Sequence, residues 1–372
     1  MPRHLVLIGG GHAHMVTLAR LVEITGRGHR VTVIQPSEHH YYSGMGPGML
    51  GRTYRPAEIR FATRQVVEKQ GGRFIRDSAV AIDTDRRQVQ LASGGAVDYD
   101  VLSCNAGSSV PNDIPGVGED DGTVFAVKPI ERLQEAQAHL KQLTARKTAS
   151  ILVVGGGPSA AEIAGNVWQL AGMTHGRPPR ITVYAGRRFM HRFAGGIRRR
   201  ALRVLSARGI EIVENDYVAA IEDGRVTTRS GRNQSADLIF LAAGVRPSGI
   251  FSASGLPTGP DGGLRVNACL QCPDHPEIFG GGDCIHFAPR PLDKVGVYAV
   301  RQNPVLCANL MAALEDRPPQ PFDPGGAYLL IFNLGGGVGI FHKWGVTFGG
   351  RLAFAIKDRI DRRFMRRFQA IE

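Results

Sequence analysis

The sequence has few cysteines, and they do not form the pattern of a disulfide framework. It carries 5 cysteines in 372 residues, which excludes the small secreted proteins that disulfides hold together. Cys269 and Cys272 are separated by two residues, but they lie in an expected loop and not at a helix N-terminus that would lower a thiol pKa. We expect these two thiols to be incidental, and Cys104, Cys284 and Cys307 to pack in apolar surroundings.

Long hydrophobic runs, a signal peptide and metal motifs are also missing. No apolar run is long enough to span a bilayer. No segment reads as a signal peptide, because a buried strand is expected almost directly after Met1. His12, His14, His39 and His40 lack the neighbouring cysteines or carboxylates of a metal site. We expect no metal site, and a reducing cytoplasm as the location.

Lysine and arginine outnumber the acidic residues, and the formal net charge is +12. A basic surface suits nucleic acid, an anionic membrane or dinucleotide phosphates. The arginines gather in one cluster near the middle of the chain and one at its C-terminus. The first cluster is Arg187, Arg188, Arg192, Arg198, Arg199 and Arg200, and the second is Arg359, Arg362, Arg363, Arg366 and Arg367. No nucleic-acid motif accompanies either cluster, so we expect no nucleic-acid partner.

Glycine is abundant, with 48 residues, and two glycine-rich loops share one context. Each stands between an expected buried strand and a helix, with a second strand beyond, which is the β-α-β order of a dinucleotide-binding unit. There the first glycine allows a tight turn, and the second lets the backbone approach the pyrophosphate at the helix N-terminus. Gly9 and Gly11 fit one loop, and Gly155 and Gly157 fit the other. A generic α/β sheet with glycine turns is the alternative.

The position that usually carries an acidic residue for the ribose hydroxyls departs from the rule in both units. The first unit has Gln35, with Glu38 as a fallback, and the second has Arg187 and Arg188. An amide bonds a hydroxyl less strongly than a carboxylate does. Arginine suits a 2′-phosphate better than a bare ribose, but a solvated basic turn explains it equally well.

We predict an α/β fold with two Rossmann-like dinucleotide-binding domains, one inserted in the other, and a small C-terminal α+β unit. The expected bounds are 1–125 with 259–318, 126–258 and 319–372. Within the first domain we expect one helix from His12 to about Thr25, and an irregular loop over residues 37–51 because of its glycines.

The C-terminus is expected to be a basic amphipathic helix. Apolar residues recur every four positions, at Leu352, Ile356, Ile360, Phe364 and Phe368, with arginines on other faces. Such a helix lies in a membrane interface. A terminal helix packed on its own core or on a partner subunit is the alternative.

Five motifs follow one another along nearly the whole chain: "IGGGHAH", "YDVLSCNAGS", "VVGGGPSAAEIAG", "LIFLAAGVRP" and "IFGGGDC". In this order they resemble the two-dinucleotide-binding-domain flavoproteins, the pyridine nucleotide–disulfide oxidoreductase superfamily. Within it the chain resembles the membrane-associated type II NAD(P)H dehydrogenases and sulfide:quinone reductases. "GGGHAHMVTL" and "YYSGMGPGML" are similar to the flavoprotein module fused to selenide, water dikinase.

The resemblance implies FAD in the first domain and NAD(P)H in the second. It implies that Glu162 frames the nicotinamide, and that a helix starting near Gly296–Tyr298 points amides at the flavin, with Glu162 and Tyr298 as catalytic residues. The implied cofactor-binding residues are Gly9, Gly11, His12, Gln35, Ser43, Gly44, Ala106, Gly107, Gly155, Gly157, Pro158, Arg187, Arg188, Gly244, Gly282, Asp283, Gly296 and Val297.

We therefore expect an FAD-dependent NAD(P)H dehydrogenase that passes electrons to a quinone or another small acceptor, peripheral on the inner face of the cell membrane. Monomer and homodimer are both left open. The family's CxxxxC pair is absent, which disfavours dithiol chemistry. One alternative is a sulfide:quinone-type reductase, for which Cys104, Cys269 and Cys272 are the only candidate thiols. Another is a flavin-binding sensor or docking protein with little turnover.

Overall fold

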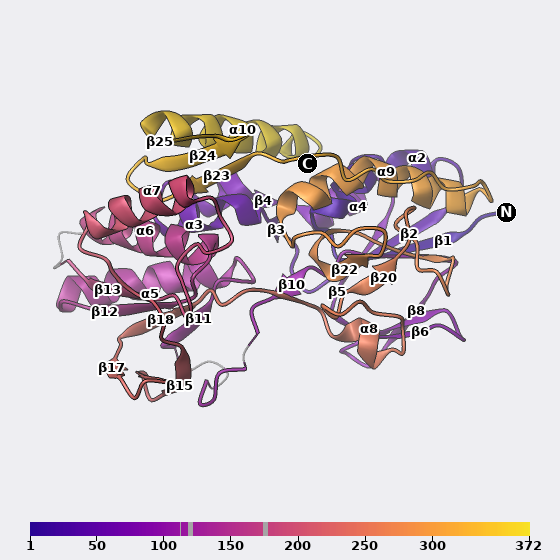
Figure 1. The fold of residues 1–372 in the computed structure, drawn as a ribbon. Helices are drawn as coiled ribbons and strands as arrows, with labels where there is room; N and C mark the ends of the chain where they lie inside the picture. Colours follow the sequence, from indigo (N-terminus) through magenta and orange to yellow (C-terminus); the bar gives the residue numbers. More distant parts are fainter. Residues whose placement is uncertain (112, 118–121, 174–177) are drawn as a thin grey trace.

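Two parallel sheets organise the chain (Figure 1). In this computed structural model the structure describes residues 1–111, 113–117, 122–173 and 178–372. The first sheet has the order β21 (Ile278–Gly280), β9 (Val101–Cys104), β1 (His4–Ile8), β2 (Arg30–Gln35) and β5 (Arg73–Arg76). The second has β11 (Val124–Ala126), β18 (Leu238–Leu241), β12 (Ser150–Val154), β13 (Arg180–Tyr184) and β14 (Glu211–Val213). These sheets confirm the predicted α/β fold class.

Four strands of the first sheet are buried nearly end to end, as in parallel sheets covered on both faces, whereas the edge strand β5 is partly exposed. The sheet's other elements follow in chain order. They are η1 (His12–His14), α1 (Met15–Ala19), α2 (Leu21–Thr25), β3 (His40–Tyr41), η2 (Ser43–Met45), α3 (Gly46–Leu50), η3 (Pro56–Ile59), β4 (Arg60–Phe61), α4 (Thr63–Lys69), β6 (Ala79–Asp83), β7 (Gln88–Leu91), β8 (Ala96–Asp98), α8 (Ile250–Ala253), β20 (Leu264–Val266), η4 (Gly282–Cys284), β22 (Ile285–Phe287) and α9 (Gly296–Leu314).

Two local predictions in this half were wrong. The single helix from His12 to Thr25 is interrupted at Arg20, whose φ of −118° and ψ of 17° leave the helical region. The stretch 37–51 is not an irregular loop, because it contains the fully buried helix α3. Pro47 lies in the first turn of α3, where its missing N–H costs nothing. The glycines permit close packing, since a Cβ on Gly48 would lie 2.6 Å from the Tyr54 ring.

The second sheet is flanked by long helices and a small antiparallel meander. Its remaining elements are α5 (Arg132–Arg146), α6 (Pro158–Met173), α7 (Gly195–Ser206), β15 (Val218–Glu222), β16 (Arg225–Thr228) and β17 (Asn233–Ser235). The chain passes between the halves through β10 (Ser108–Ser109) and β19 (Arg246–Pro247), which pair antiparallel with each other.

A C-terminal unit lies across the second half and reaches the first (Figure 1). It consists of β23 (Leu330–Asn333), β24 (Gly339–Lys343), β25 (Val346–Gly350) and α10 (Arg351–Gln369). Its side chains Phe332, Ile340, Met365 and Phe368 join the hydrophobic core of the second sheet. No described helix is both long enough and apolar enough to cross a membrane.

The predicted apolar stripe of α10 does not act as one face. Phe368 is buried and Phe364 is half-buried, whereas Leu352 is 64% exposed and Ile360 45% exposed. Residues four apart in an α-helix advance by about 40°, so a stripe of this spacing winds through about 160° over sixteen residues. The two ends of the stripe therefore meet different surroundings.

Candidate functional site

The first glycine loop lies at the carboxyl ends of β1 and β9, where the strand order of the first sheet reverses. Three glycines of this region surround Asn105. A Cβ would lie 2.4 Å from the Asn105 carbonyl oxygen at Gly9, 2.2 Å from Asn105 Oδ1 at Gly11 and 2.4 Å from Asn105 Nδ2 at Gly282. Gly9 also has a φ of +82°, which disfavours a side chain. A side chain at any of these three positions would collide with Asn105, so only glycine allows this close approach.

Gln35 and His14 set the shape of the loop. The Gln35 Oε1 atom accepts a hydrogen bond of 2.8 Å from the Gly10 N–H, while its Nε2 donates to the carbonyls of Ser37 and His39. His14, at the third position of the glycine motif, bridges the Gly9 carbonyl and the Ser103 hydroxyl, at 2.5 and 2.8 Å. The contacts of Gln35 are thus with the backbone, and a contribution to ribose binding remains a prediction.

His12 is buried beside the loop in a cluster of rings. Its ring centroid lies 4.9 Å from that of His40, 5.1 Å from Tyr42 and 5.9 Å from Phe364 of α10. Burial, with Lys128 nearby, lowers the pKa of His12 to about 4, so the ring is neutral at pH 7. Its Nε2 atom is buried and finds no hydrogen-bond partner among the described residues. An unpartnered buried nitrogen at a glycine loop suits a polar ligand.

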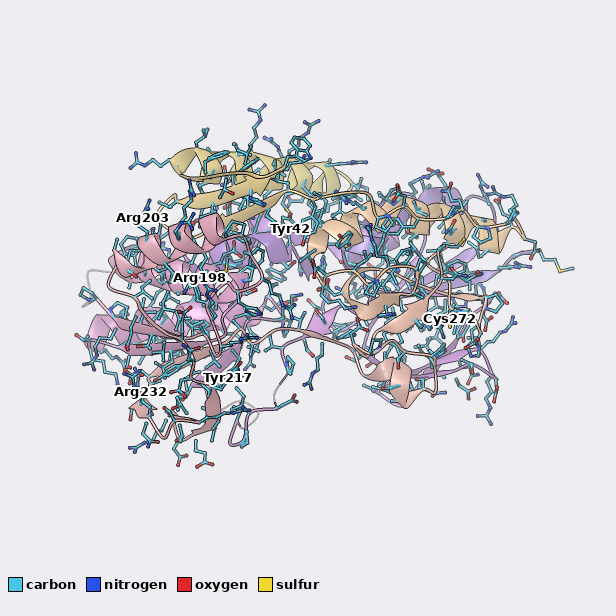
Figure 2. All side chains as sticks on the ribbon, in the orientation of Figure 1. Tyr42, Arg198, Arg203, Tyr217, Arg232 and Cys272 are labelled. Atoms are coloured by element: carbon cyan, nitrogen blue, oxygen red, sulfur yellow. The ribbon has the colours of Figure 1, made fainter. Side chains whose placement is uncertain are left out.

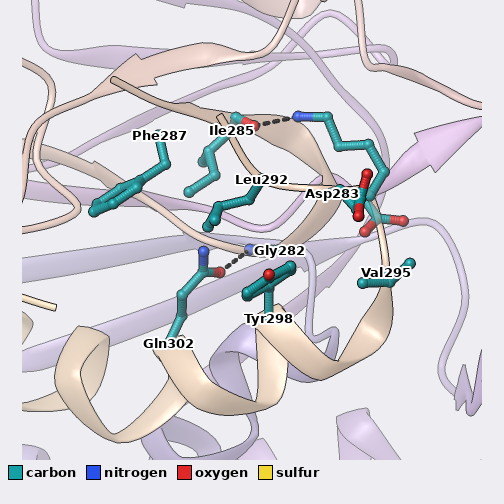
Figure 3. A pocket seen from close by; sticks show the side chains of 10 residues that line it. Gly282, Asp283, Ile285, Phe287, Leu292, Val295, Tyr298 and Gln302 are labelled. Carbon is teal, nitrogen blue, oxygen red and sulfur yellow. Dashed lines mark hydrogen bonds between the residues drawn. The ribbon is translucent and has the colours of Figure 1, made fainter. Parts of the chain in front are cut away.

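Asp283 takes part in a small polar network, and it lines a small pocket together with Gly282 and Gln302 (Figure 3). Its Oδ2 atom accepts hydrogen bonds from Lys128 Nζ at 2.7 Å and from Ser108 Oγ at 2.9 Å. Tyr298, in the first turn of α9, lines the same small pocket. The Gly282 N–H donates to Gln302 Oε1 at 2.7 Å. The pocket therefore lies between η4 and the start of α9.

The other residues implied for this half lie around the same crevice. Ala106 and Gly107 follow Asn105 directly, and Gly296 and Val297 begin α9 as expected. Ser43 and Gly44 form η2, where the Gly44 carbonyl faces α10 and accepts a hydrogen bond of 2.8 Å from Lys357 Nζ.

The second glycine loop repeats the arrangement at β12 and β18, where the order of the second sheet reverses. A Cβ on Gly155 would lie 2.3 Å from the Ala242 carbonyl oxygen, and one on Gly156 would lie 2.4 Å from that of Ala185. Among the described residues, none beyond the chain neighbours has a heavy atom within 4 Å of the Cβ positions of Gly157 and Gly244, so the mouth of the loop is open. Pro158 begins α6 immediately after, with the helix N-terminus at this mouth.

Glu162 is half-buried on α6 and contacts the C-terminal unit. Its Oε1 atom accepts a hydrogen bond of 2.7 Å from the Asn333 N–H. Burial raises the pKa of Glu162 to about 7, although the Lys357 ammonium opposes this shift. The carboxyl can hold or release a proton near neutral pH. Its implied role at the nicotinamide remains a prediction, since its contacts are with β23 and α10.

Lys357 and Asp361 form a buried ion pair one turn apart on α10. Lys357 Nζ lies 2.7 Å from Asp361 Oδ2, and the Tyr42 hydroxyl donates to Asp361 Oδ1 at 3.1 Å. Burial raises the pKa of Asp361, and the carboxylates around Lys357 raise that of its ammonium. Figure 2 shows Tyr42 beneath α10. Glu162, Lys357, Asp361 and Tyr42 make up what we term the proton-bearing cluster.

The cysteines are not placed for thiolate chemistry. All five are free, and burial raises the pKa values of Cys104, Cys272, Cys307 and, to about 11, Cys284. A thiol that stays protonated is a poor nucleophile. Cys269 is half-buried in a loop, as expected. Among the residues that the structure describes, no group of three or more histidines, cysteines or carboxylates is placed to hold a metal ion.

Sequence reasoning missed Asn105, Ser108, Lys128, Lys357 and Asp361. Asn105 lies within the motif "SCNAGS", and the spacing of Lys357 and Asp361 is that of an ion pair on a helix. Those two signals were available. Nothing local to Lys128 indicates that it meets Asp283, which lies 155 residues away in the chain.

A comparison with known proteins identifies the fold and the family. The family model for pyridine nucleotide-disulphide oxidoreductases matches residues 3–304. The chain belongs to this family. Its members use a flavin and a pyridine nucleotide, and the glycine crevice around Asn105, with the unpartnered His12 nitrogen, fits the first of these.

Three similar proteins cover most of this chain. A type II NADH:quinone oxidoreductase of Staphylococcus saprophyticus is 23% identical over 97% of this chain and 94% of its own length. A demethylphylloquinone reductase of Synechocystis sp. is 26% identical over 88% and 84%. The solved sulfide:quinone oxidoreductase of Aquifex aeolicus covers 100% of this chain and 92% of its own, with a TM-score of 0.80 and 19% identity. The similarity to this solved structure shows a shared fold.

Proposed function

We propose that this oxidoreductase binds FAD in the first half and NAD(P)H in the second, and transfers electrons from NAD(P)H to a quinone. The observation that carries the proposal is the pair of glycine crevices, each at the point where the strand order of its own parallel sheet reverses. The relatives named as quinone reductases support the choice of acceptor.

Different residues would bind the two nucleotides. The backbone around Gly11 and the amides at the start of α9 would hold the flavin dinucleotide, and Asp283 would bond its ribityl hydroxyls. The loop Gly155–Gly157 and the N-terminus of α6 would hold the pyrophosphate of NAD(P)H. When bound, FAD supplies the redox chemistry, taking a hydride from the nicotinamide and giving two electrons to the acceptor.

The proton-bearing cluster would complete the reaction. A quinone takes up two electrons and two protons to become a quinol, so the site needs groups that deliver protons. Glu162, with a pKa of about 7, holds a proton at its carboxyl near neutral pH, and the Lys357 ammonium lies within its electrostatic reach. We assign proton delivery to these two groups, with Asp361 and Tyr42 positioning Lys357.

Anaerobic mixing of the purified protein with NADPH, NADH or sulfide tests the proposal. We expect a yellow protein whose flavin absorbance is bleached by a nicotinamide nucleotide and restored by a quinone. Bleaching by sulfide alone would instead favour the sulfide:quinone-type alternative, which the buried thiols disfavour. Absence of bleaching by any donor would favour a flavin-binding sensor and overturn the proposal.

We also propose that the C-terminal unit docks on an anionic membrane surface from the inner face. It exposes large apolar side chains beside basic ones, which is the composition of an interfacial segment. Trp344 is 79% exposed, Val346 59% and Leu352 64%. Arg359, Arg363, Arg366 and Arg367 are exposed on α10.

Replacing Trp344 and Leu352 by serine is expected to lower binding to vesicles of phosphatidylglycerol and phosphatidylcholine roughly tenfold, because two partly inserted apolar side chains are lost. Co-sedimentation measures the binding. Serine at Val22 and Val80, which are 58% and 49% exposed in the first half, is the matched control and should change little. Unchanged binding in the Trp344 and Leu352 variant, or a dimer in place of vesicle binding by the native protein, would contradict membrane docking.

A further inference from the structure

The arginines that follow β13 lie directly beside the second glycine loop. The Met190 N–H donates a hydrogen bond of 2.6 Å to the Gly156 carbonyl. On the same side, the Ala185 carbonyl oxygen lies 2.4 Å from where a Cβ on Gly156 would be. The segment between these two contacts contains Arg187 and Arg188. The arginine turn is therefore part of the rim of the nucleotide crevice.

The position at the end of β13 carries no carboxylate. In a dinucleotide-binding unit an acidic side chain there bonds the 2′-hydroxyl of the adenosine ribose, whereas an arginine accommodates a 2′-phosphate. Here the strand ends at Tyr184 and continues as Ala185 and Gly186. An acidic side chain would also repel a 2′-phosphate. The lack of a carboxylate and the presence of the arginines therefore both favour a nucleotide with a 2′-phosphate.

The acidic residues that follow the neighbouring strand β14 are already occupied. Glu214 accepts two hydrogen bonds of 2.8 Å from Arg198 and one of 2.6 Å from the Phe189 N–H. Asp216 is buried and accepts a hydrogen bond of 2.7 Å from the Ser230 hydroxyl. Neither carboxylate is left to receive a ribose hydroxyl without breaking these contacts.

The guanidinium groups of Arg187 and Arg188 are accessible to a ligand. Both side chains are exposed, and neither makes an ion pair with another residue in the described part of the chain. Glu214 lies close enough for Arg188 to help lower its pKa, but its direct partner is Arg198. Tyr217, 45% exposed, lies next to Gly186 but belongs to the segment that follows β14, and the Arg229 guanidinium lies over its ring at 5.1 Å from the centroid.

We propose that this protein selects NADPH over NADH, and that Arg187 and Arg188 bind the 2′-phosphate of the adenosine. The inference deepens the proposed function, on which it rests for the identity of the nucleotide-binding half. Guanidinium groups bind phosphate through paired, charge-assisted hydrogen bonds, which a free ribose hydroxyl cannot replace. Arg187 and Arg188 are specificity-determining residues in this reading, and the hydride-transfer step does not involve them.

The experiment measures binding of adenosine 2′,5′-bisphosphate and adenosine 5′-monophosphate to the flavin-loaded protein by calorimetry. We expect the bisphosphate to bind at least roughly tenfold more tightly, and kcat/KM to favour NADPH over NADH by a similar factor. Arg187→Gln with Arg188→Gln should remove both preferences, because kcat/KM with NADPH should fall to the value with NADH.

Arg203→Gln with Arg225→Gln is the matched control. Both arginines are exposed in the same half, on α7 and β16, so the change in net charge is identical. This variant should retain the preference. Equal binding of the two nucleotides by the native protein, or a preference that survives the loss of Arg187 and Arg188, would overturn the inference.

The two proposals fail in different ways. A protein that prefers the bisphosphate but reduces no quinone would leave the inference standing and contradict the proposed function. A protein that reduces quinone equally well with NADH and NADPH would contradict the inference alone.

Discussion

Replacing Gly11 by leucine is expected to yield a protein that retains less than about a tenth of its flavin, because the side chain fills the crevice that the pyrophosphate must enter. A Cβ added at this position would lie 2.2 Å from Asn105 Oδ1. The flavin content is measured from the visible absorbance and from the FAD released on denaturation. Reconstitution with excess FAD should not restore it.

A second variant separates loss of flavin from loss of folding. Combining Gly11→Leu with Asn105→Ala removes the atom that the new Cβ would meet, yet the leucine still fills the crevice. Gly249→Ala is the control, since its Cβ would meet no heavy atom within 4 Å. A folded double variant with its full complement of flavin would show that the crevice is not the flavin site.

Replacing Glu162 by glutamine is expected to slow reoxidation of the flavin by quinone roughly a hundredfold, the usual contribution of a general acid. Bleaching of the flavin by the nicotinamide nucleotide should change by no more than about twofold, since hydride transfer needs no proton from this group. Stopped-flow spectroscopy separates the two half-reactions.

The pH dependence distinguishes proton delivery from a structural role. The pKa of Glu162 is about 7, so in the native protein the quinone step should slow as the pH rises through 7, and the glutamine variant should lack this transition. Glu131→Gln is the control, because burial raises the pKa of that carboxyl as well but it lies at the start of α5. A native pH profile in the glutamine variant would contradict the assignment.

The raised pKa of Glu162 also makes the stability of the folded protein depend on pH. A carboxyl whose pKa is raised on folding stabilises the folded state while it is protonated, and this contribution is lost as the pH rises from its unfolded value towards 7. Glu162→Gln should therefore raise Tm relative to the native protein at pH 8 and change it less at pH 5.

The sequence predicted the parts of this site that depend on local order. Both glycine loops, the strands on either side of them and the start of α9 lie where the motifs placed them. The failures were also local. The glycines of residues 37–51 indicated a loop, but they permit the close packing of α3 against Tyr54 and Asn166. The assigned domain bounds and the binding roles of the individual residues remain predictions.

The sequence by itself determined the fold class and the two glycine loops, because a strand, a glycine turn and a helix are short-range features of the chain. Only the tertiary structure decided which polar groups meet. Lys128 reaches Asp283 because both follow the carboxyl ends of strands. Glu162 of α6 comes near Lys357 because the terminal helix α10 packs on that half. It also decided which side of α10 is buried, since packing selects among faces that the pattern alone leaves equivalent.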